Sequence, residues 1–174
     1  MNTNYLKIIA LAEKAGLCFH WHIDREFFGS APGPTTVHYK VSMKKEGRRY
    51  FLFESAYTRN RSDKWVPDPE EARNFGGHNA ALAKLLEGLE HYVRLSTELL
   101  GRNLVFKTWR TANHLRDEAG RFIPSYRHYQ IVNAGGRVVA SKRLSRCQLG
   151  YSFQVVADFR KEIERMDMTQ AVAA

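Results

Sequence analysis

Hydrophobic and polar residues alternate most regularly over residues 36–44. A period of two is typical of a strand that turns one face to the core and the other to water. The apolar positions of this segment are Val37, Tyr39, Val41 and Met43, and the polar positions are His38, Lys40, Ser42 and Lys44. Because the polar positions include two lysines and a histidine, we expect that face to meet solvent or a polyanion.

Turn residues and short apolar runs predict five further strands and their connections. Glu46-Gly47 is expected to form a hairpin turn, and residues 29–34 (GSAPGP) a loop. Residues 57–65 are polar and basic and are expected to form an exposed loop. The additional strands are predicted at residues 17–23, 49–55, 104–112, 125–133 and 137–144, with a turn at 117–120.

Apolar residues at three- and four-residue spacing predict three helices, over residues 4–15, 79–100 and 153–166. The longest of them lies near the middle of the chain and carries a stripe of leucines. A short helix is expected to begin at Asp68-Pro69, because aspartate caps free backbone N–H groups and proline suits the first helical position. We expect Gly76-Gly77 to end this short helix.

The predicted order of elements is helix, three strands, helix, three strands, helix. We therefore predict an α+β fold, with antiparallel sheets of about six strands, in two groups that each contain a hairpin, packed on the long central helix. A single compact domain over residues 1–174 is expected. HYKV (38–41) and HYQI (128–131) each begin a predicted hairpin. This favours an αβββ pseudo-repeat with halves 1–75 and 76–168, and chance similarity of short segments is the other interpretation.

Gly33-Pro34 precedes the second predicted strand, and Ala80-Ala81 lies in an alanine-rich part of the long helix. Together with the order of elements, these residues make residues 4–91 similar to the double-stranded RNA-binding domain, and the resemblance implies an αβββα order for this half. That family carries a lysine cluster at the start of its second helix, where this chain has Gly76-Gly77-His78. The main phosphate clamp of the family is therefore missing, and its binding residues are not carried over.

Composition places the chain among ordinary globular proteins. Of its 174 residues, 44% are hydrophobic and 26% are charged. A chain of this length can bury a core without disulfides or metal ions. Every apolar run is shorter than the roughly 18 residues of a membrane-spanning helix. Charged residues interrupt the first apolar stretch, so we expect no signal peptide. Cys18 and Cys147 are isolated, which favours reduced thiols and a cytoplasmic location.

Positive charge is concentrated in two segments of the chain. The formal net charge is +9, from 27 Lys and Arg against 18 Asp and Glu. Residues 40–64 hold eight cations against three acids, and residues 107–146 hold nine against two. Both segments coincide with predicted hairpins and their loops. Such surfaces attract phosphates by releasing counterions, and aromatic residues beside them can stack on unpaired bases.

This distribution predicts a small non-catalytic protein that binds nucleic acid, RNA in preference to DNA, through basic hairpin surfaces. The alternative is an inhibitor or adapter that docks onto a protein or a nucleoprotein complex, and an acidic protein is a further possible partner. We expect no membrane partner and no cofactor. The residues predicted to contact nucleic acid or another partner are Lys40, Lys44, Lys45, Arg48, Arg49, Arg59, Arg61, Trp65, Arg127, Arg137, Lys142, Arg143 and Arg146.

The sequence lacks the common motifs of catalytic sites, and this does not favour an enzyme. The chain has no GxxxxGK[ST] or GxGxxG phosphate loop and no GxSxG nucleophile turn. A catalytic site built from dispersed residues stays the alternative.

His20-Trp21-His22 is the one pattern with metal-ligand spacing that we weigh. Both imidazoles project from one face of a predicted strand, and Asp24 follows two residues later. Neutral histidine is a good zinc ligand, and His38 or His128 would have to complete such a site. The interpretation that we adopt is two histidines on a polar sheet face, without a metal.

Overall fold

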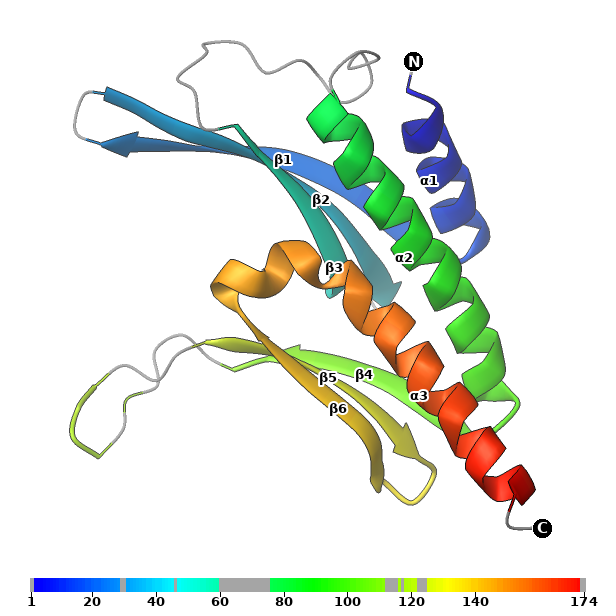
Figure 1. Ribbon diagram of the computed structural model, residues 1–174. Coiled ribbons are helices and arrows are strands. Elements are labelled where there is room, and N and C mark those ends of the chain that lie inside the picture. The colour runs from blue at the N-terminus through cyan, green and yellow to red at the C-terminus, as the bar shows by residue number, and fades with distance from the viewer. Residues whose placement is uncertain are drawn as a thin grey trace. The chain divides into compact units, whose positions relative to one another are not determined.

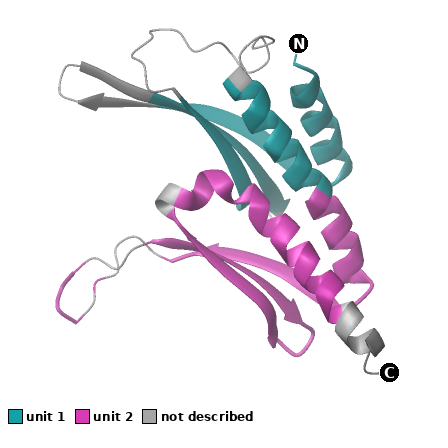
Figure 2. Cartoon of the chain, viewed as in Figure 1, with its two compact units in different colours: residues 1–90 teal, residues 91–174 magenta. Residues whose placement is uncertain are grey.

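The chain divides into two units, unit 1 over Met1–Glu90 and unit 2 over His91–Ala174 (Figure 2). The computed structural model describes residues 2–28, 31–45, 47–59, 76–111, 116, 118–121 and 125–172. Within these ranges, the side chains of residues 25–28, 31–34, 45, 59, 76, 146–147 and 167–172 are not described.

Unit 1 consists of a helix, a three-stranded antiparallel sheet and the first part of a long helix (Figure 1). The sheet order is β1-β2-β3, and α1 and α2 pack on one face of it. The order α1-β1-β2-β3-α2 is the one that the resemblance to the double-stranded RNA-binding domain implies. The elements are α1 (Thr3–Lys14), β1 (Leu17–Phe28), β2 (Ala31–Lys45), β3 (Arg48–Arg59) and the first part of α2 (Gly76–Leu100).

The core of unit 1 follows the alternation that the sequence shows along β2. Val37, Tyr39 and Val41 are fully buried, as is Ile8 of α1. A β-bulge between Val41 and Ser42 shifts the pairing with β3. The extra residue of the bulge is Leu52 of β3, and β2 keeps its register with β1. Ser42, which was expected to face solvent, is nevertheless buried, with 2% of its surface exposed.

Unit 2 has the second part of α2, a three-stranded antiparallel sheet and a final helix. The sheet order is β4-β5-β6. The Phe106 ring of β4 lies 5.9 Å from the Tyr92 ring of α2 and 6.1 Å from the Phe159 ring of α3, so both helices pack on the same face. The elements after α2 are β4 (Leu104–Arg110), β5 (Tyr126–Asn133), β6 (Val138–Ser145), the short 3₁₀ helix η1 (Arg146–Tyr151) and α3 (Phe153–Val172).

The α+β prediction is confirmed, with six strands in two antiparallel sheets and the long helix α2 in the middle of the chain, counted over the described ranges. The prediction of a single domain and the pseudo-repeat with halves 1–75 and 76–168 stay predictions. Among the helices described, none combines the length and the apolar character needed to cross a lipid bilayer.

Residues 31–34 of the Gly/Pro segment belong to a strand instead of the expected loop. β2 begins at Ala31, and Phe27 of β1 pairs with Pro32. Pairing of β2 with β3 begins only at Thr35. Within the described part of the chain, the prolines therefore lie where β2 pairs with β1 but not with β3. Proline has no backbone N–H to donate, and at these positions no hydrogen bond to β3 is lost.

The start of α2 also differs from the prediction. Gly76-Gly77 begins the long helix instead of ending a shorter one. A Cβ added to Gly77 would overlap the ring of Tyr57, so the glycine permits close contact between α2 and β3. The helix predicted from Asp68-Pro69 lies outside the described residues. At the other end of the chain, α3 extends beyond its predicted end at residue 166.

Candidate functional site

Strand alternation gives the sheet of unit 2 an outer face, opposite to the face covered by α2 and α3. Along β4, Phe106 points to the helices, while Lys107 and Trp109 are exposed on the opposite side. Register with β5 and β6 extends this side across the sheet. We define the outer face by Lys107, Trp109, Tyr126, His128, Gln130, Ser141 and Arg143.

A row of aromatic and cationic side chains crosses this outer face. Trp109 pairs in register with His128, and His128 pairs with Arg143. The rings of Trp109 and His128 stack, with centroids 4.9 Å apart and planes inclined by 6°. The Arg143 guanidinium carbon lies 4.8 Å from the centroid of the Tyr126 ring, within the range of a cation–π interaction. Trp109 remains 42% exposed, so its ring is accessible to a partner.

The second basic segment is divided between the two faces of this sheet. Arg143 lies on the outer face, and Arg137 is exposed at the turn between β5 and β6. Arg127 and Lys142 alternate to the opposite side, and Lys142 forms an ion pair with Asp158 of α3. The side chain of the last predicted cation, Arg146, is not described. Only part of the predicted set therefore shares one surface within the described residues.

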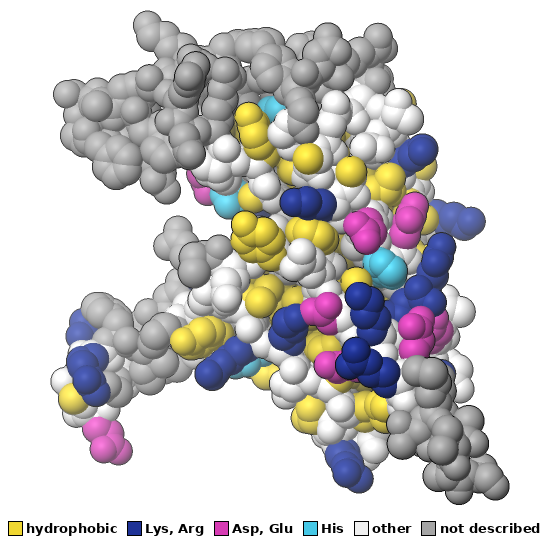
Figure 3. All heavy atoms as spheres, in the orientation of Figure 1, with side chains coloured by type: hydrophobic (Ala, Val, Ile, Leu, Met, Phe, Trp, Pro, Cys, Tyr) yellow, Lys and Arg dark blue, Asp and Glu magenta, His cyan; other side chains and the backbone are white. Residues whose placement is uncertain are grey.

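Charge over the helices of unit 2 is mixed in sign. Figure 3 shows Lys and Arg side chains beside Asp and Glu over α2 and α3. Arg160 of α3 contacts Glu98 of α2 at 3.1 Å and Glu164 of its own helix at 3.0 Å. The helix-covered side thus combines cations with carboxylates, unlike the row on the outer face.

The first basic segment gathers charge at the end of the β2–β3 hairpin. Lys44 pairs in register with Arg49, and Lys45 pairs with Arg48, on either side of the turn at Gly47. Gly47 adopts a φ of 77°, a left-handed conformation that glycine permits at little cost. The side chains of Lys44, Arg48 and Arg49 are exposed. Like charges in opposed positions are destabilising unless an anion neutralises them.

The other predicted residues of this segment lie elsewhere. Lys40 projects from the middle of β2, with its Nζ 3.6 Å from the carboxylate of Glu54 and 3.4 Å from His22 Nε2. Arg61 and Trp65 lie outside the described residues, and so do the side chains of Lys45 and Arg59.

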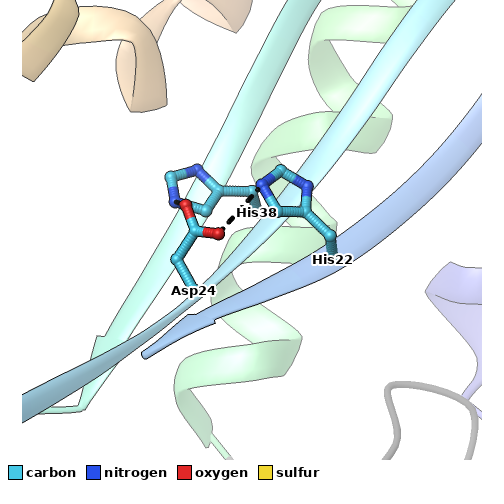
Figure 4. A group of neighbouring side chains, drawn as sticks. All are labelled: His22, Asp24 and His38. Atoms are coloured by element: carbon cyan, nitrogen blue, oxygen red, sulfur yellow. Dashed lines mark ion pairs between the residues drawn. The ribbon is translucent and has the colours of Figure 1, made fainter. Parts of the chain in front are cut away.

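The outer face of the sheet in unit 1 carries a cluster of histidines and carboxylates (Figure 4). His22 of β1 pairs in register with His38 of β2, and their rings stack with centroids 4.9 Å apart. Asp24 Oδ1 lies 3.5 Å from His22 Nε2, and Asp24 Oδ2 lies 3.3 Å from His38 Nε2. On its other side, His38 Nδ1 lies 3.6 Å from Oε1 of Glu54, a buried carboxylate with 4% exposure.

Burial and neighbouring cations set the protonation of this cluster. Desolvation, followed by the charge of Lys40, lowers the pKa of His22. Desolvation also lowers the pKa of His20, and the charges of Arg49 and Lys40 act in the same direction. Both imidazoles therefore favour the neutral form that can accept a hydrogen bond or bind a metal ion.

Sequence reasoning identified part of each arrangement. It weighed His20 and His22 as weak metal-ligand candidates, with Asp24 nearby and His38 or His128 to complete a site, and adopted a polar sheet face without a metal. The structure groups His22 with Asp24 and His38. The spacing His-x-Asp along β1 was visible, but the pairing with β2 depends on hairpin register. The row formed by Trp109 and His128 was missed, because it depends on the register between β4 and β5, which the sequence does not show.

No protein-family model matches the chain, and no curated protein matches its sequence.

Proposed function

We propose that this is a small, basic, non-catalytic protein that binds nucleic acid, RNA in preference to DNA. The proposed binding surfaces are the outer face of the sheet in unit 2 and the cationic end of the β2–β3 hairpin in unit 1. The observation that carries the proposal is the row across the outer face: Trp109 stacked on His128, and Arg143 next to both His128 and Tyr126.

This row combines the two interactions that single-stranded nucleic acid uses. Every base presents a flat π-face, and stacking on an aromatic side chain contributes about 1–3 kcal/mol per base. Trp109, with 42% of its surface exposed, offers such a ring. Arg143 lies two strands away on the same face and places its guanidinium over the Tyr126 ring, where it can contact a phosphate or stack on a second base.

The preference for RNA is supported by polar groups in the neighbouring row. Lys107, Gln130 and Ser141 pair in register across the three strands, directly beside Trp109 and His128. Amide, hydroxyl and ammonium groups can hydrogen-bond to a ribose 2′-hydroxyl, which DNA lacks. An unpaired RNA strand stacked along the aromatic row would bring its sugars to this polar row.

The end of the β2–β3 hairpin supports contact with phosphates. The register places Lys44 opposite Arg49 and the backbone of Lys45 opposite Arg48, and the described side chains of Lys44, Arg48 and Arg49 are exposed. A polyanion relieves this repulsion and releases counterions when it binds. We propose contacts for Lys44, Arg48, Arg49, Arg137 and Arg143. Lys40 and Lys142, each within ion-pair distance of a carboxylate, are expected to contribute less.

The proposal keeps the expected cytoplasmic location, for which the free thiol of Cys18 is a supporting observation. The competing function is that of an inhibitor or adapter that docks onto a protein or a nucleoprotein complex. A pull-down from lysate, with and without nuclease, separates the two. Loss of all partners after nuclease supports direct binding, and retention of one protein supports docking.

Direct binding is tested by fluorescence anisotropy with labelled single-stranded RNA, single-stranded DNA and double-stranded RNA of mixed sequence, each about 16 nucleotides long. We expect single-stranded RNA to bind most tightly. Trp109→Ala should weaken its binding by about 5- to 150-fold, the equivalent of about 1–3 kcal/mol of stacking. Tyr151→Ala removes an exposed aromatic ring from η1 instead of the sheet and is the matched control. Equal affinity of the wild type and Trp109→Ala would contradict the proposal, as would the absence of binding at low salt.

A further inference from the structure

Three side chains with metal-ligating atoms converge on the outer face of the sheet in unit 1. His22 and Asp24 project from the same side of β1, two residues apart, and His38 projects beside them from β2 (Figure 4). One ligand atom from each residue can be chosen so that all three lie within 4.8 Å of one another. Two imidazoles and one carboxylate form a set that zinc uses in proteins, with a further position left for water.

The contacts of His38 indicate which of its ring nitrogens is available. Nδ1 lies 3.6 Å from Glu54 Oε1, and this carboxylate is buried. A buried carboxylate next to an imidazole nitrogen favours a proton on that nitrogen, which leaves Nε2 with its lone pair. At 3.6 Å this contact is longer than a hydrogen bond, so His38 and Glu54 would have to move closer together for Glu54 to orient the imidazole as carboxylates orient histidine ligands in zinc sites.

Asp24 makes the region between the rings favourable for a cation. Its two oxygens lie 3.3 Å from His38 Nε2 and 3.5 Å from His22 Nε2. An unprotonated imidazole nitrogen and a carboxylate oxygen both accept hydrogen bonds, so they repel each other unless a proton or a metal ion lies between them. Three acceptor groups directed toward one point thus favour a bound cation there.

We propose that His22, Asp24 and His38 bind a divalent transition-metal ion, with zinc as the best match to the donor set, and that Glu54 orients His38 from behind. The lowered pKa of His22 supports this arrangement, because the neutral imidazole is the form that binds metal. The site is separate from the outer face in unit 2 and does not depend on nucleic-acid binding.

The positive charge of Lys40 opposes the binding of a metal ion, so a substitution of Lys40 provides a sensitive test of the proposed site. Its Nζ lies 3.4 Å from His22 Nε2 and 3.6 Å from Glu54 Oε2. Metal binding at His22 Nε2 would break the first contact, while Glu54 can retain the ammonium group. Removal of this positive charge by Lys40→Met should therefore strengthen zinc binding, whereas removal of a ligand should weaken it.

The test is a titration of the full chain with zinc chloride by isothermal calorimetry, together with visible absorption of the cobalt(II)-loaded protein. We expect one equivalent to bind, with cobalt bands typical of four or five ligands. Asp24→Asn changes an exposed side chain and should fold normally, yet lower zinc affinity by at least about tenfold, as should His38→Gln. Far-UV circular dichroism verifies the fold of each variant.

His20→Gln is the matched control, because His20 lies on the same strand and the same face but outside the cluster. It should leave zinc affinity unchanged. The proposal is overturned if the wild type binds neither zinc nor cobalt. It is equally overturned if His20→Gln abolishes binding while Asp24→Asn does not, since the ligands would then be the His20/His22 pair.

Discussion

The Tyr39 hydroxyl hydrogen-bonds to Nδ1 of His78 in the interior of unit 1, joining the middle of β2 to the first turns of α2. Both side chains are fully buried. The resemblance noted in the sequence would place a lysine cluster at this point, where the chain has Gly76-Gly77-His78. Here the start of the second helix packs into the core instead of facing phosphate, which is a physical reason to look for nucleic-acid contacts on other surfaces.

Tyr39→Phe should lower the stability of the protein. The substitution keeps the ring but removes the hydroxyl group that contacts buried His78, and the loss of a buried partner costs about 1–3 kcal/mol. Urea unfolding followed by circular dichroism measures the free energy of unfolding. Tyr151→Phe, at a tyrosine that is 59% exposed, is the control and should change nothing. Equal stability of Tyr39→Phe and wild type would show that the hydrogen bond contributes little.

Gly77→Ala should destabilise unit 1, although alanine is the better helix former. A Cβ at this position would overlap the Tyr57 ring, so the ring, the strand or the helix must move. Strain of this kind costs about 1–3 kcal/mol. Gly101→Ala is the matched control, since its new Cβ would lie 3.6 Å from the nearest atom, in ordinary contact.

A double-mutant cycle assigns the cause of the Gly77→Ala effect. In a Tyr57→Ala background the ring is absent, and the cost of Gly77→Ala should fall by about 0.5–3 kcal/mol. If the cost is unchanged in that background, contact with Tyr57 is not its origin.

Stability should decrease as the pH falls below neutrality. The folded state lowers the pKa of His20 and His22 below the ordinary value of 6.5. As pH falls through 6.5, the unfolded chain binds protons that the folded protein does not, so the free energy of unfolding decreases. Thermal unfolding in the presence of a chelator at pH 7.5 and pH 5.5 measures the change. The double variant His20→Gln/His22→Gln should lose less stability over this interval, and an equal loss would contradict the assignment.

The salt dependence of RNA affinity should distinguish charge from stacking. Each phosphate contact makes the slope of log K against log salt more negative by about 0.7 for a single strand. Arg143→Gln should make this slope less negative by about that amount, because a guanidinium on the outer face is lost. Trp109→Ala should weaken binding with the slope unchanged. Identical slopes for wild type and Arg143→Gln would exclude a phosphate contact at that residue.

Much of the fold could be predicted because its determinants are local. Alternation along residues 36–44 identified a strand with Val37, Tyr39 and Val41 in the core, and all three are buried. Residues 31–34 were misassigned because glycine and proline favour loops in isolation. Their pairing with β1 depends on residues on the other strand of the hairpin, which local composition does not describe.

The candidate sites were harder to predict because they depend on register and on partners. The sequence shows His22 and Asp24 on one strand face, but only the hairpin register brings His38 beside them. The sequence also shows the excess of positive charge, but it does not show which cations lie beside carboxylates in the fold. Lys40 lies near Glu54, and Lys142 pairs with Asp158, through contacts between segments distant in sequence.

The boundary between the two units falls within α2, between Glu90 and His91. A fragment cut at this boundary would divide a continuous helix and leave the backbone N–H and C=O groups of both new ends without their intrahelical partners. The second fragment would also keep Tyr92, which packs on Phe106, on a helical stub with no preceding turns. Either half would therefore have to be produced with the whole of residues 76–100, so that the same helix appears in both pieces.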